Sequence, residues 1–271
     1  MRGPRARQPD WRYAIRTTFW GAATLGSTHD DIVGRLWGGA DPFAGFPKRL
    51  FEVDVTGWNA GHGYLSNTIK AIRPQVIVEV GVWKGQSTIF MADRLRELTL
   101  DAVVVAVDTW LGSWDHWTDR QYWDELCFDH GYPRLYDKFM ANVLGRGLQG
   151  YVVPLPLDSV NARHVVSDRG IVADLVHVDG GHDFDAVTSD LSQWWRVLRD
   201  GGVLVCDDYH AGGEAWPEVR RAVDEFLACH AHSGFTSAAA KCWVVKQPER
   251  ISGAASRAPI YVAPAAAVAG D

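Results

Sequence analysis

Six short runs rich in valine and isoleucine alternate with segments of helical pattern, and this alternation constrains the fold more than any other feature of the chain. The runs occupy residues 75–80, 102–107, 150–156, 174–178, 201–208 and 241–246. Helical patterns follow at residues 86–98, 159–169, 184–199 and 216–229. Apolar strands separated by helices are typical of a parallel sheet covered on both faces. The sequence therefore predicts an α/β fold with a doubly wound, mostly parallel, Rossmann-like sheet.

The length sets the expected domain organisation. A chain of 271 residues with 47% hydrophobic residues can fill the core of one large α/β domain with extensions, or of two small domains. Residues 1–50 lack a clear period and carry Gly/Pro clusters, so we expect an N-terminal arm or cap. The main domain is expected at residues 51–250, and the Ala/Pro-rich residues 251–271 are expected to be a disordered tail.

Charge and cysteine content bound the partners. The net charge of −6 is spread along the chain without a long basic block, which argues against nucleic acid and membrane surfaces as partners and favours a small molecule. No C-x-x-C pair occurs, so we expect neither a zinc site nor a disulfide framework, and we predict a cytoplasmic protein with reduced cysteines. The cysteines are Cys127, Cys206, Cys229 and Cys242. No segment is apolar for long enough to predict a transmembrane helix.

Ligands of such sheets bind beyond the carboxyl ends of the strands, so the residues that follow each strand are the candidates for a site. The first strand leads into "VEVGVWKGQST", where Gly81 and Gly85 would let the backbone approach a ligand at a helix N-terminus. The motif lacks the G-x-G-x-x-G of dinucleotide sites, and Glu79 suits a cofactor with an amine and a sulfonium. Asp108, after the second strand, is placed to bind a ribose. The alternative is that the glycines only make a tight turn and Asp108 caps it.

Here the sequence resembles the class I S-adenosylmethionine-dependent methyltransferases over roughly residues 58–246. The segments "VIVEVGVWKGQST", "VVAVDTW", "LDSVNA" and "LVHVDGGHDFDAV" are similar to the branch of metal-dependent macrocin-type and mycinamicin-type sugar O-methyltransferases and cephalosporin-cluster enzymes. The resemblance implies a Rossmann-like methyltransferase sheet that binds S-adenosylmethionine. It implies cofactor contacts by Glu79, Gly81, Ser87 and Asp108, with Asp158 and Ser159 near the adenine.

Acidic residues follow two neighbouring strands. Asp179 ends one strand and Asp207 and Asp208 end the next, so the three carboxylates are expected to converge. Such a set suits Mg²⁺, which could chelate two neighbouring hydroxyls of an acceptor and lower the pKa of one. The resemblance likewise implies Asp179, Asp207 and Asp208 as metal ligands and His182 as the general base, so that Asp179 and His182 are the catalytic candidates. The alternatives are that Asp179 or Asp208 only caps a helix, and that His210 is the base.

A tryptophan-rich insertion at about residues 110–145 follows Asp108, and its pattern predicts a loop and a helical lid. Loops at the strand ends often determine substrate specificity. Trp110 is the best candidate for stacking on the cofactor, with Trp58 and Asn59 as weaker candidates upstream of the first strand. The alternative is that these tryptophans pack the core or the lid. The others in the insertion are Trp114, Trp117 and Trp123.

These observations favour an enzyme that transfers a methyl group from S-adenosylmethionine to a hydroxyl of a small molecule, a sugar or glycoside above others, with Mg²⁺ as a second cofactor. Two alternatives stay open: a metal-independent methyltransferase of the same fold, and a domain that binds the cofactor without catalysis. A nicotinamide dehydrogenase is a more distant alternative. The arm at residues 1–50 and the exposed aromatic residues would suit a homo-oligomer.

Overall fold

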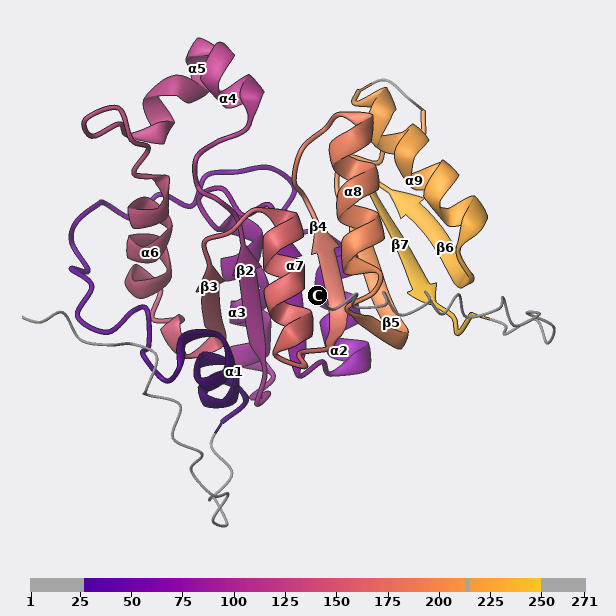
Figure 1. Ribbon diagram of the computed structural model, residues 1–271, viewed down its shortest axis with the longest axis horizontal. Helices are drawn as coiled ribbons and strands as arrows, with labels where there is room; N and C mark the ends of the chain where they lie inside the picture. The colour runs from indigo at the N-terminus through magenta and orange to yellow at the C-terminus, as the bar shows by residue number, and fades with distance from the viewer. Residues whose placement is uncertain (1–26, 213–214, 250–271) are drawn as a thin grey trace, which may run out of the picture.

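The computed structural model describes residues 27–212 and 215–249, which form one seven-stranded sheet of order β3-β2-β1-β4-β5-β7-β6 (Figure 1). The first five strands run parallel, whereas β7 is antiparallel to β5 and β6 is antiparallel to β7. The strands are β1 (Val76–Val80), β2 (Val103–Val107), β3 (Val152–Leu155), β4 (Ala173–Val178), β5 (Leu198–Cys206), β6 (His232–Ala238) and β7 (Lys241–Lys246). The predicted α/β sheet is confirmed.

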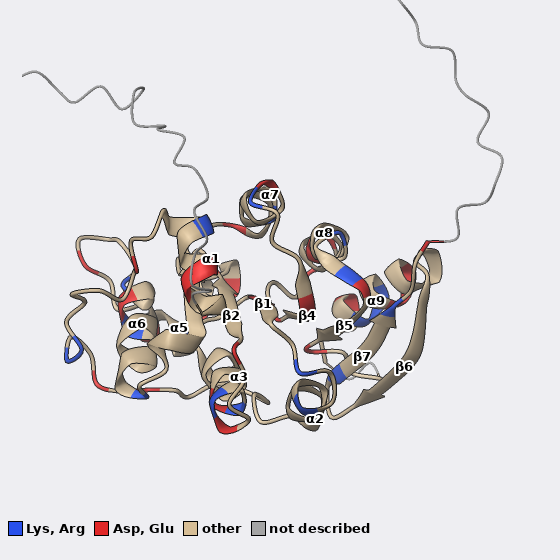
Figure 2. Ribbon diagram, turned by 90° about the horizontal axis from the view of Figure 1, so that it is seen from below, with Lys and Arg blue, Asp and Glu red and all other residues tan. Residues whose placement is uncertain are grey.

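Helices cover both faces of the sheet because the central strands are apolar on both sides. Figure 2 shows α7 and α8 on one side of the strands and α2 and α3 on the other. The first layer comprises α1 (Thr28–Trp37), α7 (Ser159–Asp168), α8 (Phe184–Trp194) and α9 (Pro217–Cys229). The second comprises α2 (Gly63–Ile72), α3 (Gln86–Glu97) and α6 (Leu135–Gly145). Every residue of β1 and β2 is buried, as expected for strands covered on both faces.

The C-terminal part of the sheet departs from the prediction in two places. The helix expected at residues 184–199 ends at Trp194, and the strand expected at 201–208 begins at Leu198, with Gly201 at a positive φ of 73°. Strand β6 has no counterpart in the prediction. Its sequence HSGFTSA is mostly polar or small, and most of its residues are exposed at the sheet edge, so the burial that produces an apolar pattern is absent.

Within the expected N-terminal arm, helix α1 is part of the main core: Ile32 and Val33 are buried, and Trp37 Nε1 donates to the Pro154 carbonyl at 3.0 Å. The expected insertion forms the short helices α4 (Trp114–Thr118) and α5 (Arg120–Trp123). Two 3₁₀ turns, Asp124–Leu126 and Gln149–Tyr151, flank α6. Figure 1 shows α4 and α5 beyond the carboxyl ends of the strands. The expected tail at 251–271 lies outside the described residues.

The register of the sheet brings the candidate residues together. Val80 pairs with Val107 and with Val178, and Val178 pairs with Cys206. These four strands therefore end at the same level, and the next residue of each follows side by side: Gly81, Asp108, Asp179 and Asp207. No helix in the described part of the chain is long and apolar enough to span a membrane.

Candidate active site

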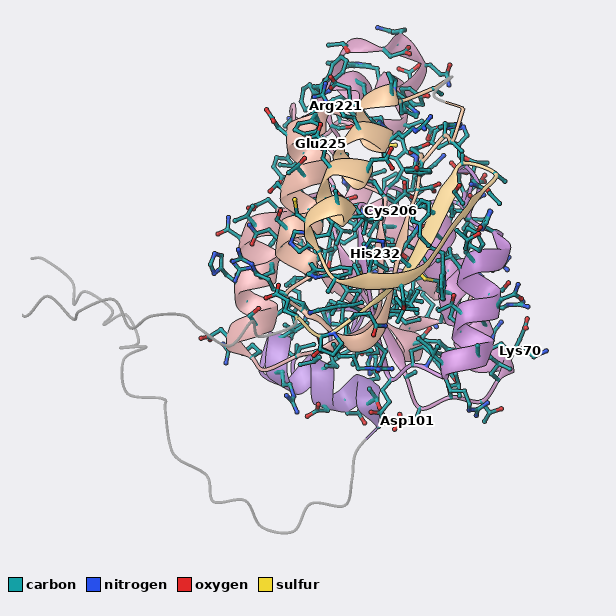
Figure 3. The ribbon with its side chains drawn as sticks, turned by 90° about the vertical axis from the view of Figure 1, so that its right-hand side faces the viewer. Lys70, Asp101, Cys206, Arg221, Glu225 and His232 are labelled. Atoms are coloured by element: carbon teal, nitrogen blue, oxygen red, sulfur yellow. The ribbon has the colours of Figure 1, made fainter. Side chains whose placement is uncertain are left out.

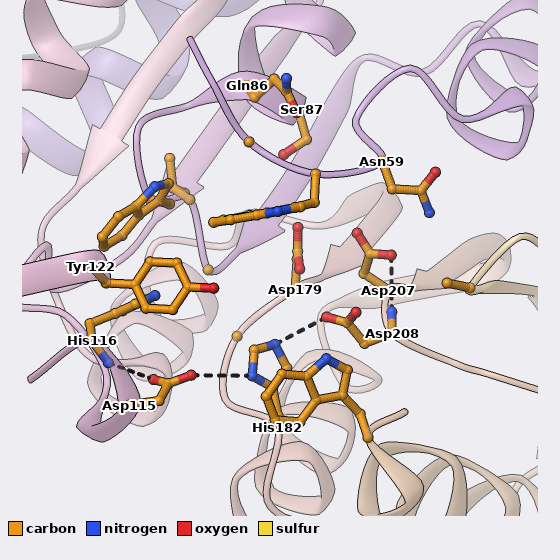
Figure 4. A pocket seen from close by; sticks show the side chains of 18 of the residues that line it. Asn59, Gln86, Ser87, Asp115, His116, Tyr122, Asp179, His182, Asp207 and Asp208 are labelled. Atoms are coloured by element: carbon orange, nitrogen blue, oxygen red, sulfur yellow. Dashed lines mark hydrogen bonds and ion pairs between the residues drawn. The ribbon is translucent and has the colours of Figure 1, made fainter. Parts of the chain in front are cut away.

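A cavity of about 530 Å³ opens at the carboxyl ends of these strands (Figure 4). Segments distant in sequence contribute to its wall, including the turn after β1, the loop after β4, the residues after β5 and the short helices α4 and α5. The hairpin turn between β6 and β7 closes one side, where Asn59 Nδ2 donates to the Ala239 carbonyl at 2.8 Å. The wall comprises residues 57–59, 81–83, 86–87, 115–116, 119, 122, 179–180, 182, 207–208, 210, 216 and 239–240.

The turn after β1 requires glycine. Gly81 has a φ of 83°, and a β-carbon there would collide with the backbone carbonyl of Asp179. The carboxylate of Asp108 holds the same turn by accepting hydrogen bonds from the N–H groups of Val82 (2.8 Å) and Trp83 (3.0 Å). Ser87, in the first turn of α3, lines the pocket. Asp108 therefore shapes the turn that faces the cavity but does not itself line it.

Three carboxylates form the acidic floor of the pocket, defined as Asp179, Asp207 and Asp208. Asp207 is paired twice: the Lys241 ammonium donates to its Oδ2 atom, and the N–H of Asp208 donates to its Oδ1 atom at 2.9 Å. Asp208 lies 3.0 Å from His182 Nε2. Asp179 accepts no hydrogen bond from a side chain among residues 27–212 and 215–249, and burial and the charge of Asp207 raise its pKa well above the ordinary value.

His182 lies between two carboxylates. Its Nε2 atom is 3.0 Å from Asp208, its Nδ1 atom is 3.7 Å from Asp115 on the lid, and its ring stacks on Trp216 with centroids 4.1 Å apart. Figure 4 shows His182 between these two acidic side chains. Burial favours the neutral imidazole, but the hydrogen bond to Asp208 and the charges of Asp208 and Asp115 prevail and raise the pKa of His182. His210 also lines the pocket, with Nε2 3.9 Å from Asp208.

The acidic floor fits a hard divalent cation in part. Ligand atoms of His177, Asp179 and Asp207 lie within 4.8 Å of one another, and the unpartnered carboxylate of Asp179 has the oxygen donors that Mg²⁺ prefers. Two of the three carboxylates already have partners in the chain, however, because Asp207 is paired with Lys241 and Asp208 with His182. Asp179 is therefore the carboxylate best placed to hold a cation, next to two that have partners in the chain.

Besides Asp108, four residues expected near the cofactor lie away from the pocket wall. Glu79 is fully buried and accepts a hydrogen bond from Thr88 while its other oxygen is 3.0 Å from His177 Nδ1. Trp110 is 1% exposed, because its ring packs on α6 with the Phe139 centroid at 4.8 Å. This placement matches the alternative that the tryptophan packs the core.

The two residues expected near the adenine serve local structure. Asp158 caps α7 by accepting from Asn161 N–H at 3.0 Å, and the hydrogen bonds from the side chain and the backbone of Asn161 hold the pKa of Asp158 below its usual range. The hydroxyl of Ser159 accepts from Trp194 Nε1 at 2.8 Å.

Aromatic side chains form the wall opposite the floor, and the sequence prediction missed several of them. The Trp83 ring stacks on His116 with centroids 4.1 Å apart, and Tyr122 meets His116 edge to face at 5.2 Å. Trp58, a weaker candidate, is 61% exposed and meets Tyr122 at 5.7 Å. The acidic and aromatic residues of "DTWLGSWDHWTD" were the available signal for the lid.

No sequence motif indicated that Lys241 and His177 lie at the site. Both are interior residues of the sheet, and only the strand order brings them to the acidic floor.

Comparisons with known proteins agree with this geometry. A family model described as "Methyltransferase domain" matches residues 78–209. The fold is similar to that of the O-methyltransferase TomG from Streptomyces achromogenes, solved in complex with SAM, at 16% identity and a TM-score of 0.51 over 74% of this chain and 84% of that one. It is also similar to cofactor-bound Rv0187 from MTB (17% identity, TM-score 0.50, 80% and 94% covered). A putative O-methyltransferase from Klebsiella pneumoniae gives 16% identity and a TM-score of 0.50, with 82% and 97% covered. Residues 78–209 therefore match the model of a methyltransferase domain, and the described residues share the fold of these solved proteins.

Proposed function

We propose that the protein is an S-adenosylmethionine-dependent O-methyltransferase whose acceptor is a hydroxylated small molecule, a sugar or glycoside. One observation carries the proposal: a single pocket joins the glycine turn at Gly81 and Ser87 to the acidic floor and His182. When bound, S-adenosylmethionine supplies a methyl group on a sulfonium. The turn contributes backbone and a helix N-terminus on one side of the pocket, and the floor contributes carboxylates on the other.

His182 is the base that this arrangement supports. Its Nε2 atom is hydrogen-bonded to Asp208, which leaves the lone pair on Nδ1, beyond hydrogen-bond distance of Asp115, to accept the proton of the acceptor hydroxyl. The carboxylates of Asp208 and Asp115 then stabilise the imidazolium from both sides. The resulting alkoxide is the nucleophile for the methyl group, and the aromatic wall at Trp58 and Tyr122 offers a stacking surface to the rest of the acceptor.

A divalent cation held by Asp179, Asp207 and Asp208 belongs to this proposal as a second cofactor. Bound there, Mg²⁺ would lower the pKa of an acceptor hydroxyl. Its support is the unpartnered Asp179 carboxylate and the proximity of Asp207. A metal-independent enzyme of the same fold is the second candidate, and it is favoured by the pairing of Asp207 with Lys241 and of Asp208 with His182.

The test is transfer of labelled methyl from S-adenosylmethionine to a panel of sugars, glycosides and phenols, with Mg²⁺ or with excess chelator. His182→Ala should lower transfer by about 10²–10⁴-fold while S-adenosylhomocysteine binding is retained. His210→Ala is the matched control, since it removes the other imidazole near Asp208, and it should keep most of the activity. A larger loss in His210→Ala than in His182→Ala would refute the base assignment.

Two further outcomes separate the alternatives. Transfer that survives the chelator would remove the metal from the proposal and select the metal-independent enzyme. Binding of S-adenosylhomocysteine without transfer to any acceptor of the panel would count against the proposed acceptor class and favour a domain that binds the cofactor without catalysis.

A further inference from the structure

Lys241 is the least exposed cation of the site, with 0% of its surface accessible. It is the first residue of β7 and directly follows Ala239 and Ala240, the residues of the hairpin turn that line the pocket. Its ammonium forms an ion pair with Asp207 and lies 3.3 Å from His177 Nε2. A buried ammonium is costly unless it is paired and hydrogen-bonded, so this placement requires its partners.

The polar contacts continue from Lys241 towards the cofactor turn. His177 Nδ1 lies 3.0 Å from Glu79, and Glu79 accepts a hydrogen bond from Thr88 on α3, next to the pocket residue Ser87. These contacts form a buried polar row, defined as Thr88, Glu79, His177, Lys241 and Asp207. The row crosses the neighbouring strands β1, β4, β5 and β7 and joins the two ends of the pocket.

The buried polar row and the acidic floor together contain more acidic than basic side chains. Glu79, Asp179, Asp207 and Asp208 are acidic, whereas Lys241 is the one lysine or arginine among the described residues that contacts them. Like charges in a confined space repel, and the repulsion is greatest where water is excluded. Without Lys241, the carboxylate of Asp207 would lie buried beside Asp179 with no cation of the chain against it.

We propose that Lys241 is a positioning residue: it is the fixed cation that compensates the acidic floor and keeps the cofactor side of the pocket assembled whether or not a divalent cation is bound. It acts through Asp207 on one side and through His177 and Glu79 on the other, and it does not touch the reacting atoms. The inference rests on the proposed function in one respect, namely that the pocket binds S-adenosylmethionine.

The test compares wild type, Lys241→Met and Lys246→Met. Lys246 is a matched control because it lies at the other end of β7 and donates to two backbone carbonyls, Trp195 and Leu198, both at 2.7 Å. The dissociation constant of S-adenosylhomocysteine and the melting temperature are measured with Mg²⁺ and with chelator. Wild type should bind S-adenosylhomocysteine equally well in both.

Lys241→Met should bind S-adenosylhomocysteine at least about tenfold more weakly in chelator and should melt about 10 °C lower, because a buried carboxylate loses its partner. The Lys246→Met variant should lower the melting temperature without changing the affinity for S-adenosylhomocysteine. Wild-type affinity in the Lys241→Met variant would overturn the proposal. Loss of wild-type binding in chelator would also overturn it, since a metal and not Lys241 would then be the compensating charge.

A second variant keeps the test decisive if Lys241→Met does not fold. The double variant Lys241→Met with Asp207→Asn removes both charges, so it should melt higher than Lys241→Met alone. Equal melting temperatures, or failure of both variants to fold, would overturn the compensating role. If wild type binds no S-adenosylhomocysteine in either buffer, the proposed function fails, and the melting temperatures alone decide the role of Lys241.

Discussion

We predict that Asp190 makes the stability of the protein depend on pH. It lies on α8, and its Oδ2 atom would be 2.8 Å from a β-carbon at Gly180, within the loop that carries Asp179 and His182. Burial raises the pKa of Asp190 from 3.8 to about 6, although a hydrogen bond from Ser159 opposes the change. The folded protein therefore holds a proton at Asp190 more tightly than the unfolded chain does.

This difference has a sign and a magnitude. The neutral carboxyl gives its full contribution to stability below pH 3.8, the value of the unfolded chain, and the contribution is lost as the pH rises through about 6. A difference of about two pKa units corresponds to about 3 kcal/mol. Asp190→Asn is neutral at every pH and does not lose this contribution.

The assay is urea unfolding of wild type and Asp190→Asn between about pH 4 and pH 8. We expect the free energy of unfolding of the variant, relative to wild type, to rise by about 3 kcal/mol across this range. Asp185→Asn is the control, because Asp185 is exposed on the same helix, and its difference from wild type should stay nearly constant. A difference between wild type and Asp190→Asn that does not change with pH would refute the reasoning.

Two further substitutions test the turn and the buried tryptophan. Gly81→Ala should lower the free energy of unfolding by more than about 2 kcal/mol and weaken S-adenosylhomocysteine binding, because its β-carbon meets backbone at a positive φ. Gly150→Ala is the control, because a β-carbon at Gly150 meets open space, and it should change neither property. Equal calorimetric melting temperatures for the two variants would contradict this prediction. Trp110→Ala should lower the free energy of unfolding in denaturant by about 3–5 kcal/mol, because it leaves a cavity. Trp58 is exposed, so Trp58→Ala should alter ligand binding with little loss of stability. If Trp110→Ala instead altered ligand binding with little loss of stability, Trp110 would belong to the binding site.

The parallel part of the fold could be predicted from the sequence because its strands are buried on both faces and therefore read as apolar runs. Strand β6 could not, because an edge strand with exposed residues such as Phe235 and Thr236 keeps no apolar pattern. The packing of helix α1 on the core could not be predicted either, because its buried residues Ile32 and Val33 are too few to show a period.

The candidate site was predictable in its acidic part, since Asp179, Asp207 and Asp208 follow strands that end at the same level. What each carboxylate contacts was not predictable. The partner of Asp207 is 34 residues further along the chain, on a strand whose position beside β5 is set by sheet topology and not by local sequence. The orientation of Trp110 likewise depends on how α6 packs, which no motif encodes.

The place of Lys241 in the chain affects the order in which the protein can be assembled during synthesis. Asp207 leaves the ribosome before Lys241, so for a time its carboxylate has no lysine partner. Until β7 adds to β5, the acidic edge is uncompensated and the strand β5 is unpaired on that side. A nascent chain that ends before residue 241 would therefore lack both the β5–β7 pairing and the lysine partner of Asp207.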